Sequence, residues 1–195
     1  MNEKEWNIKY EQSAASSFNT KLEMYLFDQV NNQKFNEHKF EEFDCFEITE
    51  NVVKEYVASW QIKYKSDEYN ERIKPIDDKI EIIYKENKAE IDKLKKDYIN
   101  LRFRKIFAQK DFIDLQNEKK CFYCKITEDN IKDLIAKKQL YKKHISRVWT
   151  FEIDRRKPNF EYDKKNCVLC CYWCNNAKTD EFDDTEFIPD SALDY

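Results

Sequence analysis

Glycine is absent from this 195-residue chain. Every turn or helix end that needs a positive φ must therefore use another residue, and Lys, Asp and above all the many Asn residues are the expected substitutes. The same absence excludes the Gly-rich phosphate loops of P-loop and dinucleotide-binding proteins.

Long apolar runs are also missing. No stretch approaches membrane-spanning length, and the N-terminus carries no apolar signal core. These features predict a cytoplasmic protein that makes no membrane contact. Histidine is scarce as well, because only His38 and His144 occur, so few side chains are available as a conventional general base.

Charge is unevenly distributed along the chain. The net charge is −4, yet residues 119–180 hold 15 Lys or Arg against 8 Asp or Glu, and residues 181–195 hold six acids and no base. The basic block and the acidic tail nearly cancel, so the whole-chain charge does not argue against a nucleic-acid-binding surface.

Helical periodicity dominates the first 118 residues. Apolar positions repeat at helical spacing over 21–30, and Thr49 is a predicted N-cap for a second helix over about 50–60. From Ile76 to about residue 118, Ile, Leu and Tyr recur near heptad spacing among many charges, which predicts one long helix. Its apolar stripe indicates an intramolecular packing face or helical hairpin, a dimerising coiled coil, or an arm that follows DNA.

The pattern changes at Lys119. Thr127 is a predicted N-cap for a short helix, residues 149–154 alternate as a strand, residues 166–170 form a second apolar strand, and a helix is predicted from about Cys171.

Six of the seven cysteines lie in this part of the chain, whereas Cys45 stands alone as an expected small buried apolar residue. Two Cys-x-x-Cys pairs, Cys121 with Cys124 and Cys171 with Cys174, supply the four thiolates of a closed tetrahedral zinc site. Cys167 and Cys170 are expected to be strand residues. The 46 residues between the pairs exceed what a zinc ribbon needs, so the zinc must enclose a further element.

That enclosed segment resembles the HNH, or ββα-metal, endonuclease family. The matching elements are the strand that ends at Asp154, the turn, the second strand from Asn166, and the helix opening Cys174-Asn175 followed by Lys178. The resemblance covers roughly residues 119–185. It implies an α+β protein: a mainly helical region over 1–118 for scaffolding, dimerisation or partner binding, then a zinc-stapled ββα-metal domain with an acidic tail over 119–195.

The resemblance also implies roles for individual residues. Asp154 and Asn175 would bind a catalytic Mg²⁺ or Mn²⁺, a hard ion that takes oxygen ligands, and Asn166 would pin the turn between the strands. The chain departs from the family after Asp154, where Arg155 replaces the usual His base. Arginine stays protonated and is no base, but a minority of HNH-like enzymes share this Asp-Arg pair, in which the Arg binds the scissile phosphate.

A replacement base or nucleophile must then come from another segment. His144, ten residues before Asp154, and Tyr123, inside the first Cys pair, are the candidates, and each has a plain packing role as its alternative. The bases expected to contact phosphates are Arg155, Arg156, Lys157, Lys164, Lys165 and Lys178.

Two functions remain open at this point. One is a metal-dependent endonuclease acting on nucleic acid, DNA rather than RNA, in a setting such as phage defence or a mobile element. The other is a catalytically silent zinc module that binds nucleic acid or a partner protein within a larger complex or a homodimer. Retention of Asp154 and Asn175 together favours the first, since a binding module needs neither.

Overall fold

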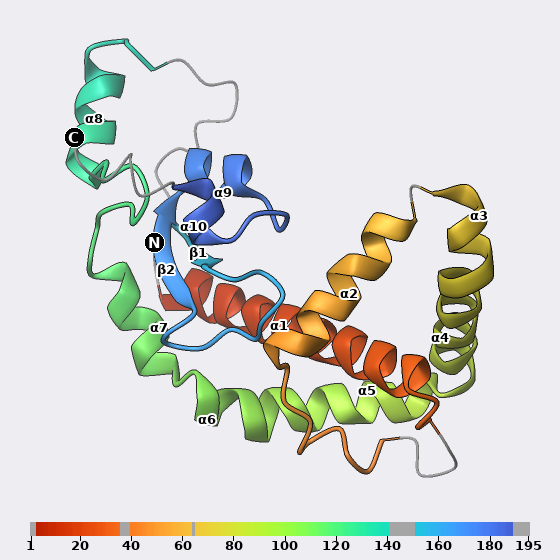
Figure 1. Ribbon diagram of the computed structural model, residues 1–195. Helices are drawn as coiled ribbons and strands as arrows, with labels where there is room; N and C mark the ends of the chain where they lie inside the picture. The colour runs from red at the N-terminus through yellow and green to blue at the C-terminus, as the bar shows by residue number, and fades with distance from the viewer. Residues whose placement is uncertain (1–2, 36–39, 64, 141–150, 189–195) are drawn as a thin grey trace. The chain divides into compact units, whose positions relative to one another are not determined.

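The computed structural model describes residues 3–35, 40–63, 65–140 and 151–188, and the chain forms two compact units (Figure 1). The helical unit is Ala14–Phe103, and the cysteine unit combines Met1–Ser13 with Arg104–Tyr195. Most of the described chain is helical and one antiparallel sheet has two strands, so the α+β class is confirmed. No helix in these ranges is both long and apolar enough to cross a bilayer.

The division between the units falls earlier than residue 118. Phe107 and Phe112 are fully buried in the cysteine unit, where the Phe112 ring packs 5.3 Å from that of Tyr10 and the Tyr10 hydroxyl donates to the Phe107 carbonyl at 2.6 Å. Because these rings are buried there, the segment after Phe103 belongs to the cysteine unit.

The helical unit is built around α1 (Glu3–Asn31), which is far longer than the expected helix over 21–30. From residue 14 onward α1 buries Phe18, Leu22, Tyr25 and Leu26, which lie at helical spacing. Its other elements are α2 (Glu50–Ile62), α3 (Ser66–Glu68), the π-helical turn Tyr69–Ile73, α4 (Lys74–Glu86), α5 (Lys88–Asp97) and the π-helical turn Tyr98–Phe103.

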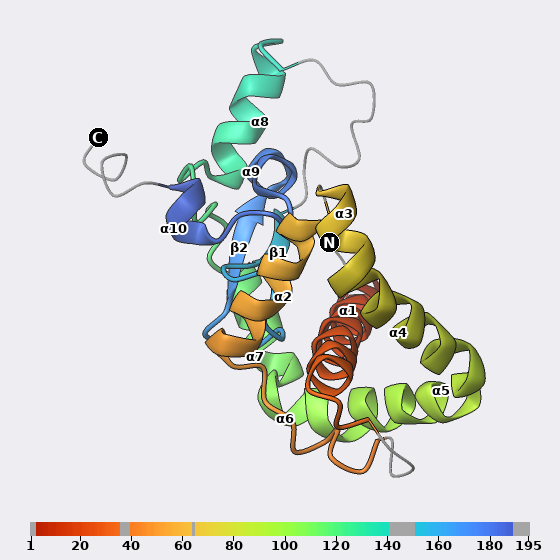
Figure 2. The same ribbon diagram turned by 45° about the vertical axis from the view of Figure 1, so that its right-hand side comes forward.

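The single long helix predicted from residue 76 to about 118 is wrong. Asn87 (φ −113°, ψ 22°) separates α4 from α5, and its side-chain amide donates to the Ile83 carbonyl at 2.8 Å. A side-chain bond of this kind competes with the helical backbone, and the chain bends there (Figures 1 and 2). A second interruption follows at Ala108, whose ψ of 142° is extended.

The cysteine unit contains α6 (Arg104–Ile106), α7 (Gln109–Gln116), α8 (Glu128–Ala136), β1 (Phe151–Arg155), β2 (Cys167–Cys171), α9 (Tyr172–Lys178) and α10 (Asp184–Phe187). Its core gathers residues from the first Cys pair, α8 and both strands, namely Cys121, Tyr123, Ile131, Phe151, Leu169, Cys170 and Cys171. Trp173 packs against this core, whereas Trp149 lies outside the described residues.

Both predicted N-caps are confirmed. The Thr49 hydroxyl accepts from the Val52 amide at the start of α2, and Thr127 forms a capping box with Asn130 at the start of α8.

Two smaller expectations are wrong. Cys45 is exposed instead of buried. Positive φ occurs, among the residues described, at Gln33, Lys119, Lys125, Lys138 and Thr179, so lysine substitutes for glycine as expected but asparagine does not.

Candidate functional site

The first cysteine pair lies in a tight turn that is held by backbone hydrogen bonds within the turn and to β2. The Cys121 amide donates to the Ile126 carbonyl at 2.9 Å, and the Lys125 amide returns to the Cys121 carbonyl at 3.1 Å. Lys125 closes the turn with φ 61°. The Phe122 amide donates to the Leu169 carbonyl at 2.8 Å, which ties the turn to β2.

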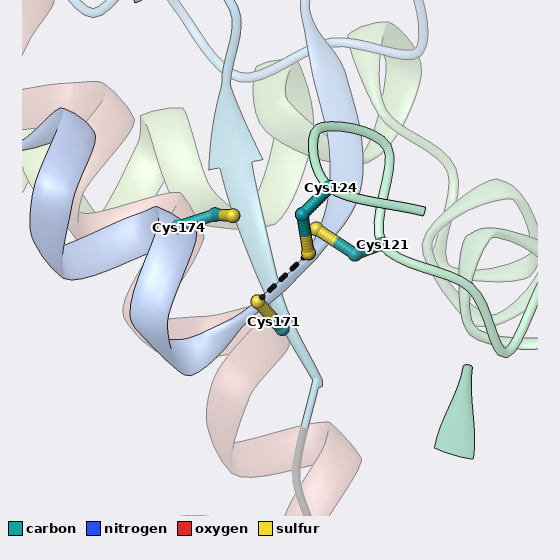
Figure 3. A group of neighbouring side chains, drawn as sticks. All are labelled: Cys121, Cys124, Cys171 and Cys174. Atoms are coloured by element: carbon teal, nitrogen blue, oxygen red, sulfur yellow. Dashed lines mark hydrogen bonds between the residues drawn. The ribbon is translucent and has the colours of Figure 1, made fainter. Parts of the chain in front are cut away.

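The second pair comes from the junction of β2 and α9. Cys171 is the last residue of β2 and the N-cap position of α9, and Cys174 lies in the first turn of that helix. The four sulfurs point toward one another (Figure 3). They all lie within 4.8 Å of one another, and Cys124 Sγ and Cys171 Sγ are 3.7 Å apart.

These distances fit a tetrahedral thiolate site. A Zn–S bond of about 2.3 Å places neighbouring sulfurs of a tetrahedron about 3.8 Å apart. The thiols also influence one another's ionisation: a hydrogen bond from Cys171 lowers the pKa of Cys121, and the same bond, with burial, raises the pKa of Cys171. The four adjacent sulfurs can hold a metal such as zinc, whose charge would stabilise them as thiolates.

Cys167 and Cys170 are not members of the cluster. Both are buried in β2, and the Cys170 thiol donates to the Glu152 carbonyl at 3.5 Å. Burial raises the pKa of both thiols, as it does for structural cysteines. Their prediction as strand residues is confirmed.

Helix α9 follows β2 directly and contacts polar residues of β1. The two strands pair antiparallel, with Phe151 opposite Cys171 and Asp154 opposite Val168. Because strand side chains alternate between faces, Glu152 and Asp154 share one face. Asn175 of α9 donates from its side-chain amide to Glu152 Oε2 at 2.6 Å, and Lys178, one turn later, reaches Asp154.

Asp154 is buried and has two polar partners. Its Oδ2 accepts from the Tyr123 hydroxyl at 2.5 Å and lies 3.2 Å from Lys178 Nζ. Lys178 is fully buried, and its ammonium also donates to the Arg155 carbonyl at 2.7 Å. Burial raises the pKa of Asp154, against the opposing effects of Tyr123 and Lys178.

The same contact bears on Tyr123. Burial, and then its hydrogen bond to Asp154, raise the pKa of the Tyr123 hydroxyl, so the phenol stays protonated at neutral pH. In this arrangement Tyr123 orients Asp154.

Arg155 is enclosed instead of extended into solvent. Only 7% of its side chain is exposed, its guanidinium donates to the Phe160 carbonyl and to Asp180 Oδ1 at 3.3 Å each, and its carbon lies 4.9 Å from the centroid of the Tyr162 ring. Asp180, in contrast, is 81% exposed. The buried cation is thus held by a carboxylate at the surface.

The loop between the strands is fixed by Asn166. Its side-chain amide donates to the carbonyls of Lys157 and Glu161 at 3.0 Å, and its Oδ1 accepts from the Lys157 amide at 2.9 Å. Arg156 next to this loop pairs with the buried Asp184 at 2.5 Å, which joins α10 to the end of β1.

The predicted phosphate-binding bases divide into groups. Lys157, Lys164 and Lys165 are exposed, although Lys164 lies 2.7 Å from Asp111. Lys178 has no exposed surface, so its ammonium cannot reach a phosphate, and its predicted contact is corrected to the buried pair with Asp154. His144, the other candidate base, lies outside the described residues.

Three acidic residues that contact the predicted site residues were not predicted from the sequence: Glu152, Asp180 and Asp184. The alternation of β1 could have indicated Glu152, since it stands two residues before Asp154. No comparable signal marks Asp180 and Asp184, because their partners lie about 25 residues away in the chain.

Comparisons with known proteins supply no further assignment: no family model, no curated protein and no solved structure matches this chain.

Proposed function

We propose that this protein is a metal-dependent endonuclease that hydrolyses phosphodiester bonds in DNA, with the four-cysteine cluster as a structural zinc site. The observation that carries the proposal is the shared polar face of β1 and α9. There Glu152 contacts Asn175 and Asp154 contacts Lys178 of the same helix, whose first turn carries a cysteine of the cluster that fits zinc. A strand–strand–helix unit held in this way resembles the HNH arrangement.

Glu152, Asp154 and Asn175 offer the oxygen donors of a catalytic site. Oxygens of this kind suit Mg²⁺ or Mn²⁺, which when bound polarises the phosphodiester and activates water. Tyr123 and Lys178 orient Asp154 through the contacts to its Oδ2. A metal-binding role for Asp154 therefore uses its other oxygen.

Arg155 is proposed to bind the scissile phosphate. Its guanidinium is desolvated, so its attraction for an anion is stronger than that of a surface cation. In this structure Asp180 Oδ1 accepts a hydrogen bond from the guanidinium on its solvent side. A phosphate that replaces Asp180 would accept hydrogen bonds from the guanidinium N–H groups, whose spacing matches the phosphate oxygens. The same contact would stabilise the negative charge that develops in the transition state.

The direct test is cleavage of plasmid DNA by the zinc-loaded protein in Mg²⁺ or Mn²⁺, with a duplex RNA of equal length alongside. Asn175→Ala should lower the rate by roughly a hundredfold or more, the scale of a lost catalytic contact. Asn176→Ala is the matched control, since Asn176 is exposed and its side-chain amide donates to the Tyr172 carbonyl within α9. Equal rates for both variants would refute the site.

One observation favours a second candidate, a zinc module that binds nucleic acid or a partner protein without cutting. The buried Lys178 ammonium already neutralises Asp154. A carboxylate paired in this way serves packing as well as it serves catalysis, and wild-type protein that binds DNA but leaves it intact in both ions would select this candidate.

The Asp154–Lys178 pair can be examined separately. Lys178→Met alone leaves a buried carboxylate without its cation and should cost roughly 3–5 kcal/mol of unfolding free energy. Adding Asp154→Asn should recover most of that loss in urea unfolding. The recovered double variant should bind DNA yet not cut it if the protein is a nuclease, and a double variant with wild-type cleavage would remove Asp154 from the site.

A further inference from the structure

A pocket in the helical unit lies among α1, α2 and α4. Its volume is about 340 Å³, at the small end of the range of about 300–1,000 Å³ for ligand sites. The volume suits a single side chain. Its lining comes mainly from aromatic and acidic residues: Phe27, Tyr56, Trp60, Tyr84, Glu23, Asp77 and Glu81, with Ser59, Ile80 and Lys63 completing it.

Two of its four aromatic residues are exposed. Trp60 is 45% exposed and Tyr84 37%, although the Tyr56 ring packs 6.0 Å from Trp60 and 5.3 Å from Phe27. Exposed Trp and Tyr around a pocket are typical of protein-binding surfaces. The open faces extend beyond what a small free ligand would cover.

The charge of the lining is acidic. Its lining holds three carboxylates, Glu23, Asp77 and Glu81, and one ammonium, that of Lys63, while Lys85 beside the lining pairs with Glu81. Such a balance repels phosphates and favours a cation. The nucleic acid proposed for the cysteine unit is therefore a poor occupant of this pocket.

Lys63 shows how the pocket holds a cation. Its ammonium lies 3.8 Å from the centroid of the Trp60 ring and 2.9 Å from Asp77 Oδ2. Tyr69 also donates to Asp77 Oδ2 at 3.2 Å, which fixes that carboxylate. An aromatic face beside a carboxylate is the combination that binds organic cations.

We propose that this pocket binds an arginine side chain of a protein partner, with the guanidinium displacing the Lys63 ammonium from Trp60 and Asp77. Arginine fits better than lysine because its planar group stacks on Trp while its fork pairs with a carboxylate. A polypeptide, unlike a free amine, would also cover the exposed parts of Trp60 and Tyr84.

The experiment is titration of the ¹⁵N-labelled full chain, followed by NMR. The chain has four Trp residues, and the Trp60 indole N–H resonance is assigned by its loss in Trp60→Phe. N-acetyl-argininamide should shift this resonance saturably, and its neutral citrulline analogue should not. Acetyl-Leu-Arg-Leu-amide should bind at least about tenfold more tightly, since its apolar side chains cover the exposed rings.

Three variants of lining residues and one control test the pocket. Asp77→Asn should weaken binding by about fivefold or more, as expected for a lost charge-assisted contact. Asp78→Asn removes the same charge outside the lining and should change the affinity less than about twofold. Lys63→Gln should tighten binding, because it removes the competing cation. Glu81→Gln removes a second carboxylate of the lining, one that pairs with Lys85 one turn away in α4, and should also weaken binding.

An indole shift of equal size with citrulline, equal effects of Asp77→Asn and Asp78→Asn, or weaker binding by Lys63→Gln would overturn the site. Equal affinities for the two arginine ligands would overturn the protein partner and assign the pocket to a free cation. None of these measurements depends on DNA cleavage.

Discussion

At the scale of single residues, the chain encloses an arginine, Arg155, directly after the buried Asp154. The Arg155 guanidinium is buried against Tyr162 and the Phe160 carbonyl, and it also donates to the exposed Asp180. A buried cation whose partner is a surface carboxylate can exchange that carboxylate for another anion without unfolding its surroundings.

This exchange predicts a gain of function. Asp180→Asn removes the competing charge, so DNA affinity should rise by several-fold and more steeply at low salt, where screening is weak. Glu181→Gln is the control, because it removes an equal charge from the adjacent exposed position. Fluorescence anisotropy with labelled duplex DNA at two salt concentrations measures both.

Replacement of Arg155 should lower the cleavage rate, in contrast to the gain in DNA affinity expected for Asp180→Asn. Arg155→Ala should lower single-turnover cleavage by about a hundredfold, and Arg155→Lys should recover only part of it, since one ammonium cannot reproduce a two-pronged contact. If the protein is the silent module, wild type does not cut and Arg155→His is the variant that would introduce cleavage. An active wild type that tolerates Arg155→Ala would contradict both interpretations.

At the scale of elements, the residue that ends α9 has an unfavourable backbone conformation. Thr179 has φ 58° and ψ −167°, a region that is essentially restricted to glycine. Its hydroxyl donates to the Lys178 carbonyl at 2.6 Å and accepts from the Glu181 amide at 3.2 Å. The turn therefore stabilises itself locally while it directs Asp180 back toward Arg155.

Replacement of this residue should stabilise the unit. Thr179→Gly removes the side-chain clash at a positive φ and should raise the unfolding free energy by roughly 1 kcal/mol, after the loss of its hydroxyl bonds and the greater freedom of unfolded glycine. Urea unfolding of the zinc-loaded protein measures the change. Thr185→Gly, in α10 at ordinary helical geometry, should instead destabilise, and a destabilised Thr179→Gly would show that the turn is not strained.

At the scale of the whole molecule, the two units rely on different sources of stability. The helical unit buries an aromatic core around Phe18, Tyr25, Phe43, Tyr98 and Phe103. The small core of the cysteine unit includes two of its four clustered cysteines, Cys121 and Cys171. Metal binding and folding should therefore be coupled in the second unit alone.

This difference predicts a partial loss of structure without metal. One zinc per chain should be found by metal analysis, and its removal by a chelator should abolish amide-exchange protection in residues 119–140 and 151–188, while residues 14–35, 40–63 and 65–103 stay protected. Cys121→Ser should act like the chelator. Cys45→Ser is the matched control, because Cys45 is exposed and outside the cluster. Uniform loss of protection, or a fold indifferent to Cys121→Ser, would contradict the assignment.

The sequence by itself determined the features that depend on short spacing. Two Cys-x-x-Cys pairs implied the four-sulfur cluster, Thr49 and Thr127 marked helix starts, alternation located the first strand and an apolar run located the second. Each signal acts within a few residues, because a cap reaches three residues ahead and a strand repeats every two.

Only the tertiary structure decided which polar groups face one another. The local chain did not show that Lys178 turns inward to Asp154, that Asp180 holds Arg155, or that Glu152 meets Asn175. These partners are more than twenty residues apart, and burial of an isolated charge is so costly that its neighbour determines whether it is a surface lysine or a buried one. That neighbour exists only once β1, β2 and α9 have packed together.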